Sequence, residues 1–165
     1  MNIQGNQRLN FENVWKNNGV PEDVIGLWKL YGVLSQDQID LRAHQLVYVV
    51  RNESGSAIGV STAFKAYIKQ LRNYFYAFRC MLIPEYRIPG LTSKLVVMTR
   101  DFLESIHEQD EGEKAIGVIT LVENERIKQN RREAIWPASK MVYIGNSGNG
   151  SQIRVYYFKG ARISP

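Results

Sequence analysis

The chain has 165 residues, a length typical of one domain, and its Lys and Arg residues exceed Asp and Glu by five. This surplus favours an anionic partner without naming one. Cys80 is the one cysteine, which excludes an internal disulfide and favours a reducing compartment, so we expect a cytoplasmic protein. No apolar run of about 18 residues and no signal-peptide pattern occurs, so we expect no membrane partner. Cys, His and carboxylate residues show no metal-ligand spacing, so we expect no metal.

The N-terminal part of the chain predicts two short helices after a polar segment. Residues 1–18 carry few apolar anchors, so they predict either a short first strand or a loosely docked arm. Pro21 is a favoured first residue of a helix, which we expect to end at Gly32. Ser35 and Gln38 have the spacing of a capping box, and this predicts a second helix.

Three strands are expected next. Leu46 to Arg51 and Ala57 to Ile68 flank a tight turn that is rich in polar residues, which is typical of an antiparallel hairpin. Tyr74 to Ile83 is a run of almost only aromatic and aliphatic residues that ends at Pro84, which indicates a strand buried on both faces.

A glycine turn and a long helix follow the buried strand. Ile88 cannot be helical because Pro89 follows it, and we expect a helix from Leu91 to Ile106. The apolar residues of one helix face recur at intervals of four, three, four and four; they are Leu91, Leu95, Met98, Phe102 and Ile106. The first N–H groups of such a helix have no internal partner, so this strand, turn and helix predict an anion site.

The C-terminal part predicts another buried strand, a helix and a final hairpin. We expect the strand at Ala115 to Val122 and a helix from Arg126 to about Ile135, because Trp136 precedes a proline. Two strands, Met141 to Ile144 and Ile153 to Phe158, then flank a turn that is rich in Gly and Asn. This order of elements predicts an α/β fold with a mixed antiparallel and parallel sheet and helices on both faces.

The sequence of the glycine turn resembles a motif of a known protein family. Arg87-x-x-Gly90-x-Thr92, followed by Ser93 and Lys94, resembles the pyrophosphate loop of the Gcn5-related N-acetyltransferases, Arg/Gln-x-x-Gly-x-Gly/Ala. Thr92 departs from this pattern, since the family usually has Gly or Ala there. By order of elements the resemblance extends from about residue 21 to residue 158, and it implies a single acetyltransferase-like domain over residues 1–165.

The resemblance also implies a cosubstrate, acetyl-coenzyme A, and the residues that bind it. Main-chain groups of two strand residues would pair with the pantetheine arm, and N–H groups of the turn would hold the diphosphate. Ser93 and Lys94 would add a hydroxyl group and a charge, and Asn124 would contact the pantetheine arm. The main-chain groups implied in this way belong to Met81, Ile83, Arg87, Ile88, Gly90, Leu91 and Thr92.

The implied reaction is direct transfer of an acetyl group to the amine of a small molecule or peptide in a ternary complex. The candidate bases are Glu85, at the end of the buried strand, and Glu123 or Glu125, after the next parallel strand. The family's usual tyrosine acid is absent from the helix that starts at Arg126, so Tyr143 is the candidate acid.

Other interpretations stay open. Without a clear base or acid, the chain could be a degenerate relative that binds coenzyme A, or serve as an interaction domain. The aromatic residues at 74, 76 and 78 could contact nucleic acid, and the basic residues between 126 and 132 could contact nucleic acid or the 3′-phosphate end of the cofactor. Core packing and a solvated helix face explain them better, so nucleic acid is not the expected partner. The hairpin from Met141 to Phe158 could pair with a second copy in a homodimer.

Overall fold

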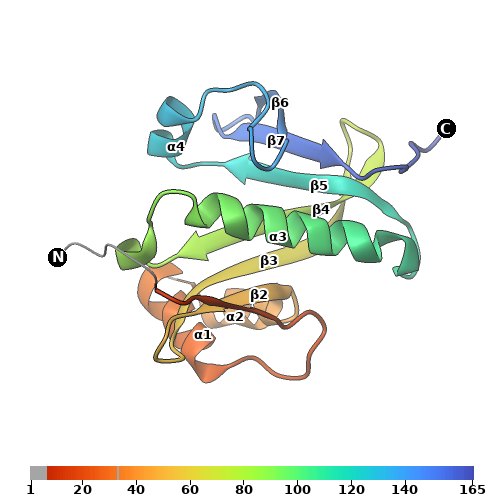
Figure 1. Cartoon of the computed structure of the whole chain (residues 1–165). Helices are drawn as coiled ribbons and strands as arrows, with labels where there is room; N and C mark the ends of the chain where they lie inside the picture. Colours follow the sequence, from red (N-terminus) through yellow and green to blue (C-terminus); the bar gives the residue numbers. More distant parts are fainter. Residues whose placement is uncertain (1–6, 33) are drawn as a thin grey trace. The chain divides into compact units, whose positions relative to one another are not determined.

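The computed structural model of the chain describes residues 7–32 and 34–165. Seven strands form one mixed sheet with the order β1-β2-β3-β4-β5-β7-β6 (Figure 1). The elements, in chain order, are β1 Asn10–Asn13, α1 Glu22–Leu27, the π-helix η1 Trp28–Gly32, α2 Gln36–Ala43, β2 Leu46–Arg51, β3 Ala57–Ile68, β4 Asn73–Leu82, the 3-10 helix η2 Pro84–Tyr86, α3 Leu91–Ile106, the 3-10 helix η3 His107–Gln109, β5 Ala115–Val122, α4 Glu125–Asn130, β6 Val142–Asn146 and β7 Gln152–Tyr157.

The predicted α/β fold class is confirmed. β4 and β5 run parallel, while β1–β2, β2–β3, β5–β7 and β6–β7 are antiparallel pairs. The chain divides into two compact units, which we describe separately. The first unit comprises Met1–Thr62 and Cys80–Leu95, and the second comprises Ala63–Arg79 and Val96–Pro165.

The first unit packs helices against both faces of β2 and β3. Val49 and Val60 belong to a core cluster that includes Trp28 and Ile39 of the N-terminal helices. The neighbouring residues along the same strands, such as Val50 and Ile58, instead pack with Leu91 and Leu95 from the first turns of α3. This division follows from the alternation of side chains along a strand, and it places the start of α3 on the opposite face from α1 and α2.

The N-terminal segment contains a strand, as one of the two predictions had it. β1 pairs antiparallel with β2, and residues 1–6 of the predicted segment lie outside the described residues. Arg51 of β2 donates to Glu12 of β1 at 2.9 Å and to Asp23 of α1 at 2.5 Å. Burial acts to raise the pKa of Asp23, but the Arg51 hydrogen bond and the Ala57 N–H outweigh it, so this pKa is lowered.

The capping box and the central helix are where the sequence predicts them, with one difference in the buried face. Ser35 Oγ accepts from the Gln38 N–H at 3.3 Å, and the Gln38 side chain accepts from the Ser35 N–H at 2.9 Å. In α3 the fully buried residues are Leu95, Thr99 and Leu103, while the predicted Met98, Phe102 and Ile106 are half-buried. The apolar pattern of the sequence did not indicate the row formed by Leu95, Thr99 and Leu103, because Thr99 is polar. Each half-buried residue, such as Met98 or Phe102, directly precedes a fully buried one in the sequence, so the two rows lie next to each other on the helix surface.

In the second unit, the backbones of β5 and β7 approach each other closely at Gly117. β5 pairs with β4 on one side and with β7 on the other, and buried side chains of these three strands, among them Phe75, Ile116 and Val155, form one core cluster. A Cβ atom at Gly117 of β5 would overlap the carbonyl oxygen of Tyr156 in β7. Glycine at this position therefore permits the two backbones to pair.

α4 is shorter than the sequence predicts, since it ends at Asn130 instead of about Ile135. The guanidinium group of the buried Arg154 explains the difference. It donates to the carbonyl oxygens of Glu133 at 2.8 Å and of Arg131 at 3.3 Å, and its Cζ lies 4.2 Å from the centre of the Trp136 ring. The Arg131 carbonyl also accepts from the Trp136 ring N–H at 3.1 Å, and the Glu133 carbonyl has no helical partner because Pro137 lacks an N–H, so side chains bond these carbonyls where the helix has ended.

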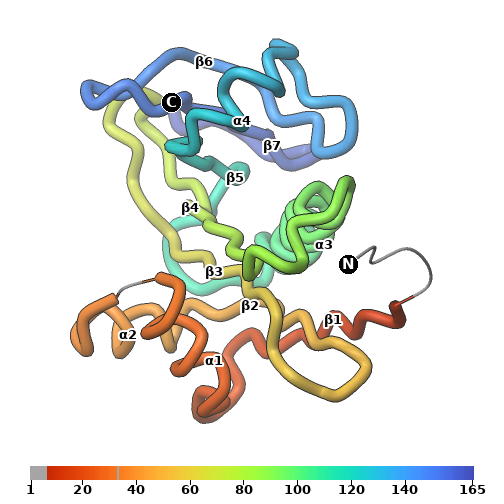
Figure 2. The backbone as a smooth tube through the Cα atoms, turned by 90° about the vertical axis from the view of Figure 1, so that its left-hand side faces the viewer, coloured from red at the N-terminus to blue at the C-terminus, as the bar shows by residue number. Residues whose placement is uncertain are grey.

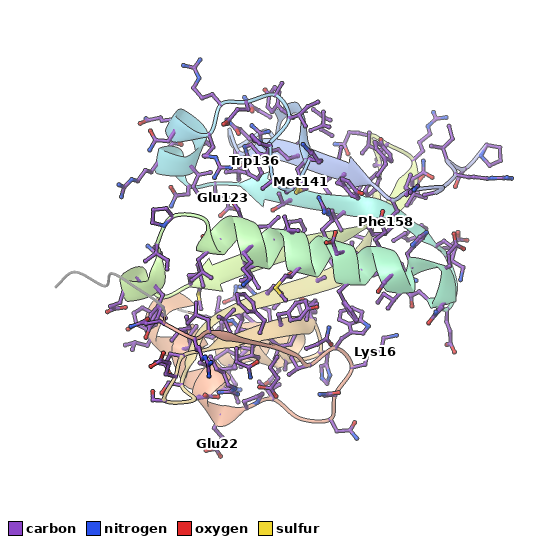
Figure 3. The ribbon with its side chains drawn as sticks, viewed as in Figure 1. Lys16, Glu22, Glu123, Trp136, Met141 and Phe158 are labelled. Atoms are coloured by element: carbon purple, nitrogen blue, oxygen red, sulfur yellow. The ribbon has the colours of Figure 1, made fainter. Side chains whose placement is uncertain are left out.

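The residues after α4 then cover part of the outer edge of β6. Tyr143 N–H donates to the Ala134 carbonyl at 2.8 Å, and Trp136 N–H donates to the Met141 carbonyl at 3.0 Å; Trp136 and Met141 are labelled in Figure 3. This edge is therefore less exposed than the hairpin sequence suggests. A homodimer through this hairpin stays a prediction, and its pairing would be limited to the end of β6 near Asn146.

Candidate functional site

The turn between β4 and α3 is built by a proline, a short helix and a glycine. Pro84 starts η2, and Tyr86 N–H bonds the Ile83 carbonyl at 3.0 Å. Gly90 precedes α3 with a φ of +83°, a conformation that side chains with a Cβ rarely adopt. The Gly90 carbonyl accepts from Lys94 N–H at 2.9 Å, so Gly90 stands at the N-cap of the helix.

Glycine at the N-cap leaves main-chain donors unused. Two of the five predicted N–H groups are bonded inside the turn, since Arg87 donates to Pro84 at 3.2 Å and Leu91 donates to Ile88 at 3.3 Å. The unused groups all belong to residues that are exposed or half-exposed, and none has a hydrogen-bond partner within residues 7–32 and 34–165. They are the N–H groups of Ile88, Gly90, Thr92 and Ser93. Converging donors at the positive end of a 16-residue helix form a favourable position for an anion.

The two basic side chains of the turn have other contacts. Arg87 Nε donates to the Leu82 carbonyl at 3.1 Å, and the Lys94 ammonium lies 4.7 Å from the centre of the Phe11 ring. The Leu82 carbonyl and the Phe11 ring both belong to the first unit. These contacts use one of the five Arg87 donors and direct the Lys94 ammonium toward Phe11.

At the end of β4, the main-chain N–H and C=O groups of successive residues point alternately toward β3 and away from it. Ile83 N–H donates to the Ile58 carbonyl of β3 at 3.0 Å, so it is already used in the sheet. The Met81 carbonyl oxygen lies 2.9 Å from where a Cβ of Gly59 in β3 would be, so it also faces β3. Because alternate residues of a strand direct their N–H and C=O groups to opposite sides, Cys80 and Leu82 direct theirs away from β3. Sequence reasoning chose Met81 and Ile83 because the register of β4 against β3 cannot be read from the sequence.

Pairing between β4 and β5 ends before either strand does. The last paired residues are Ala77 and Ile119, and the Thr120 hydroxyl of β5 donates to the Phe78 carbonyl at 3.2 Å just beyond them. A side chain therefore replaces a main-chain bond where the parallel ladder stops. Sequence reasoning missed Thr120, since a threonine within an apolar run gives no signal of such a contact.

Cys80 is an inert thiol at neutral pH. Its side chain packs against the cluster that contains Leu82 and Leu95, and burial raises the pKa of its thiol to about 12. A thiol with this pKa is almost wholly protonated at pH 7, so Cys80 is unsuited to act as a nucleophile.

The residues after β5 form a helix start of a different kind. Asn124 is the N-cap of α4, and its side-chain oxygen accepts from the Ile127 N–H at 3.1 Å. Only the amide nitrogen of Asn124 is left for a ligand. Glu125 forms an ion pair with Lys128, one turn along the helix.

The other three candidate catalytic residues, Glu85, Glu123 and Tyr143, are not joined to one another by a hydrogen bond. Glu85 belongs to the first unit, and Glu123 and Tyr143 belong to the second. Glu85 and Glu123, the latter labelled in Figure 3, are exposed carboxylates with no hydrogen bond or ion pair to any described residue. Tyr143 is 42% exposed, and its hydroxyl donates to Asn146 Oδ1 at 3.2 Å. Their roles stay predictions.

The part of the chain that the structure describes contains neither a metal-binding cluster nor a membrane-spanning helix. No group of three or more His, Cys, Asp or Glu side chains in this part of the chain could hold a metal ion. Among the same residues, no helix has both the length and the apolar character that crossing a membrane requires.

The chain is similar to solved structures of acetyltransferases. A phosphinothricin acetyltransferase of the GNAT superfamily from Sinorhizobium meliloti, in complex with AcCoA, matches with a TM-score of 0.67 at 12% identity, over 93% of this chain and 90% of that one. A GNAT family N-acetyltransferase (YhbS) from Escherichia coli, in complex with CoA, has a TM-score of 0.63 at 13% identity, over 96% and 86%. An acetyltransferase of the GNAT family from Streptococcus pneumoniae has a TM-score of 0.63 at 11% identity, over 92% and 100%. No protein-family model and no curated protein matches the chain.

Proposed function

We propose, from the premise that this chain has the fold of the Gcn5-related N-acetyltransferases, that it transfers an acetyl group from acetyl-coenzyme A to an amine. The acceptor is a small molecule or a peptide. The amine nitrogen attacks the thioester carbonyl in a ternary complex, the carbon–sulfur bond breaks, and coenzyme A leaves as a thiolate that takes up a proton.

The observation that carries this proposal is the set of unused N–H groups before α3. The groups of Ile88, Gly90, Thr92 and Ser93 are donors with no partner among the described residues, and a diphosphate is an anion with several acceptor oxygens. The phosphinothricin acetyltransferase and YhbS structures contain AcCoA and CoA, which carry such a diphosphate. The residues of the turn therefore fit the cosubstrate.

The pantetheine arm of the cosubstrate would pair with main-chain groups of β4. Cys80 and Leu82 are the residues whose groups face away from β3, so we assign this pairing to them in place of Met81 and Ile83. Arg87 Nε already donates to the Leu82 carbonyl, which has a second lone pair for a ligand N–H. Asn124 would offer its amide nitrogen, because its oxygen caps α4.

Proton transfer would use the exposed carboxylates through water. Glu85 or Glu123 would accept a proton from the attacking amine, and the Tyr143 hydroxyl would give a proton to the leaving thiolate. A positioned base or acid typically contributes about 10²- to 10⁴-fold to the rate. We therefore expect Glu85→Gln or Glu123→Gln to lower kcat at least ~100-fold if that residue is the base, with little change in cofactor binding.

The direct test is turnover with a panel of amines and peptides. Release of the coenzyme A thiol is followed by absorbance, and the acetylated product is identified by mass spectrometry. Amine-dependent thiol release with a product heavier by one acetyl group is the expected result. Binding of acetyl-coenzyme A without transfer to any amine would contradict catalysis.

A second candidate function is supported by the same two carboxylates. Neither Glu85 nor Glu123 has a partner among the described residues that would orient it. A chain without an oriented base could bind coenzyme A and act as an interaction domain. Wild-type binding with no turnover, together with unchanged behaviour of both glutamine variants, would favour this alternative.

A further inference from the structure

The second unit contains a pocket that the proposed acetyl transfer does not use. It has a volume of about 320 Å³ and lies between α4 and the hairpin of β6 and β7, which are side by side in Figures 1 and 2. Small-molecule sites usually have volumes of about 300–1,000 Å³, so this pocket has room for a small ligand. The lining residues are all polar or glycine: Glu125, Lys128, Gln129, Arg132, Asn146, Gly150 and Gln152. A lining of this kind fits a polar ligand and disfavours an apolar one.

The groups that remain unused in this pocket are mostly donors. Asn146 Oδ1 accepts from the Tyr143 hydroxyl at 3.2 Å, and Gln152 Oε1 accepts from Arg154 at 3.5 Å. Each amide oxygen thus has one partner and keeps a second lone pair, while neither NH₂ group donates to a described residue, so both NH₂ groups are available to a ligand. The guanidinium group of Arg132 has no hydrogen bond or ion pair to any residue in the described ranges, so its five N–H donors are also available.

The charges around the pocket favour an anion. Lys128 and Arg132 carry positive charge, and Glu125 offsets one of them through its ion pair with Lys128. Lys128 also donates to the Gly150 carbonyl at 3.2 Å, which ties α4 to the turn of the hairpin. One unpaired cation, Arg132, thus remains in the lining.

A second cation lies directly behind the lining residue Gln152. Arg154 is 1% exposed, its Nε has no hydrogen-bond partner in the part of the chain that the structure describes, and no described carboxylate forms an ion pair with it. Its other nitrogens donate to neutral groups, the carbonyls after α4 and Gln152. Burial lowers the pKa of Arg154 although the Glu133 carboxylate attracts this cation, so an anion bound nearby would offset part of the desolvation that remains.

We propose that the pocket between α4 and the β6–β7 hairpin binds a small oxyanion of the phosphate type, held by Arg132, Gln152 and Asn146. Phosphate oxygens accept the several converging donors, and the Arg132 fork pairs with two of them. A phosphorylated small molecule is the chemical class that matches both the volume and the donors. This inference goes beyond acetyl transfer, and its test does not require acetyl-coenzyme A.

The test is a titration of the isotope-labelled full chain with inorganic phosphate at constant ionic strength, followed by amide NMR signals. Saturable shifts confined to residues 128–132 and 146–152 are expected, with binding about tenfold weaker in Arg132→Gln. Arg126→Gln is the matched control, because Arg126 is an exposed cation of the neighbouring helix α4 that does not line the pocket. It should bind phosphate within ~twofold of the wild type.

A second variant keeps the proposal testable if Arg132 also has a structural role. Asn146→Asp replaces an amide donor with a carboxylate at the exposed end of β6, so it should weaken phosphate binding by at least ~tenfold. Shifts that do not saturate, or equal weakening by Arg126→Gln and Arg132→Gln, would show general attraction to a basic surface and overturn the proposal.

Discussion

The two parallel strands of the sheet are followed by two helix starts that differ in their N-cap. After β4 the N-cap is Gly90, which offers no side-chain acceptor, and the N–H groups of Thr92 and Ser93 have no partner in residues 7–32 and 34–165. After β5 the N-cap is Asn124, whose oxygen accepts from Ile127 N–H at 3.1 Å. The same strand–turn–helix plan thus leaves donors free in one case and satisfies one of them internally in the other.

The different N-caps suit the two turns to different roles: the turn before α3 to binding an anion, and the turn before α4 to stabilising its helix. A helix start that keeps its donors unsatisfied is less stable by itself but is prepared for an anion, while a capped start gains stability and loses binding capacity. We therefore expect changes at the first helix start to affect cofactor binding and changes at the second to affect mainly stability.

Apart from a change of the backbone at Gly90 itself, the largest effect on cofactor binding is expected from a negative charge at the first helix start. Thr92→Glu places a carboxylate beside the donors that would hold the diphosphate, and like-charge repulsion should weaken acetyl-coenzyme A binding at least ~30-fold. The same carboxylate favours the positive end of α3, so the free energy of unfolding should rise by about 0.3–1 kcal/mol. Calorimetric titration and chemical denaturation measure the two effects.

The opposite signs of these two effects make the result specific. Arg126→Glu introduces the same charge at the start of α4 and serves as the control, with binding expected within ~threefold of the wild type. Unchanged binding by Thr92→Glu would remove the turn before α3 from the cofactor site.

A smaller effect is expected from displacing the end of β4. A Cβ atom at Gly59 would overlap the Leu82 side chain and lie 2.9 Å from the Met81 carbonyl oxygen, so Gly59→Ala should push β4 outward. We expect a loss of about 1–3 kcal/mol in unfolding free energy and roughly tenfold weaker cofactor binding.

The buried Val60, next to Gly59 in β3, offers a matched control. Val60→Ala should lower stability by a similar amount through a cavity, without pressing on Leu82. Equal losses of binding in the two variants would attribute the effect of Gly59→Ala to instability and not to the position of β4.

The second helix start can be tested with a change that keeps its cap. Asn124→Asp retains an oxygen for Ile127 N–H and removes the amide nitrogen, so the unfolding free energy should stay within ~0.5 kcal/mol. Loss of one donor should weaken cofactor binding about three- to tenfold. Asn124→Ala, which removes the cap as well, should cost about 1 kcal/mol of stability. Weakening by Asn124→Asp as large as that by Thr92→Glu would mean that both helix starts contribute alike.

The smallest effect on function is expected at Cys80. Its main-chain groups face away from β3, but its side chain packs in the core and burial raises the pKa of its thiol to about 12. Cys80→Ala should therefore leave kcat within ~twofold while lowering stability by about 1 kcal/mol. Detection of an acetyl group on Cys80 by mass spectrometry during turnover would contradict a direct transfer to the amine.

Much of the fold could be predicted from local patterns. The observed bounds match the predicted ones for β2, β3, α3 and β5, because each has a clear apolar pattern and is flanked by polar or turn residues. α4 could not be predicted to full accuracy, since its end at Asn130 depends on Arg154, which is distant in sequence. A long-range side-chain contact of this kind leaves no local signal.

The candidate site was predictable where main-chain chemistry follows from residue type. Gly90 before a helix indicates free donors, and the structure leaves Ile88, Gly90 and Thr92 N–H without partners among its described residues. The choice between Met81 and Leu82 depends on the strand register, which only the pairing with β3 fixes. Sequence reasoning also missed Thr120 and the polar pocket at α4, because these depend on contacts between separate segments.

The measurement that tests the central claim most directly is calorimetric titration of acetyl-coenzyme A into the wild type, Gly90→Val and Gly112→Val. Both glycines have positive φ, +83° and +75°, with open space around them, so the two valine variants carry similar backbone strain. The account predicts micromolar binding by the wild type and Gly112→Val and at least ~100-fold weaker binding by Gly90→Val. No binding by the folded wild type, or equal binding by all three, would contradict a cofactor site at the turn before α3.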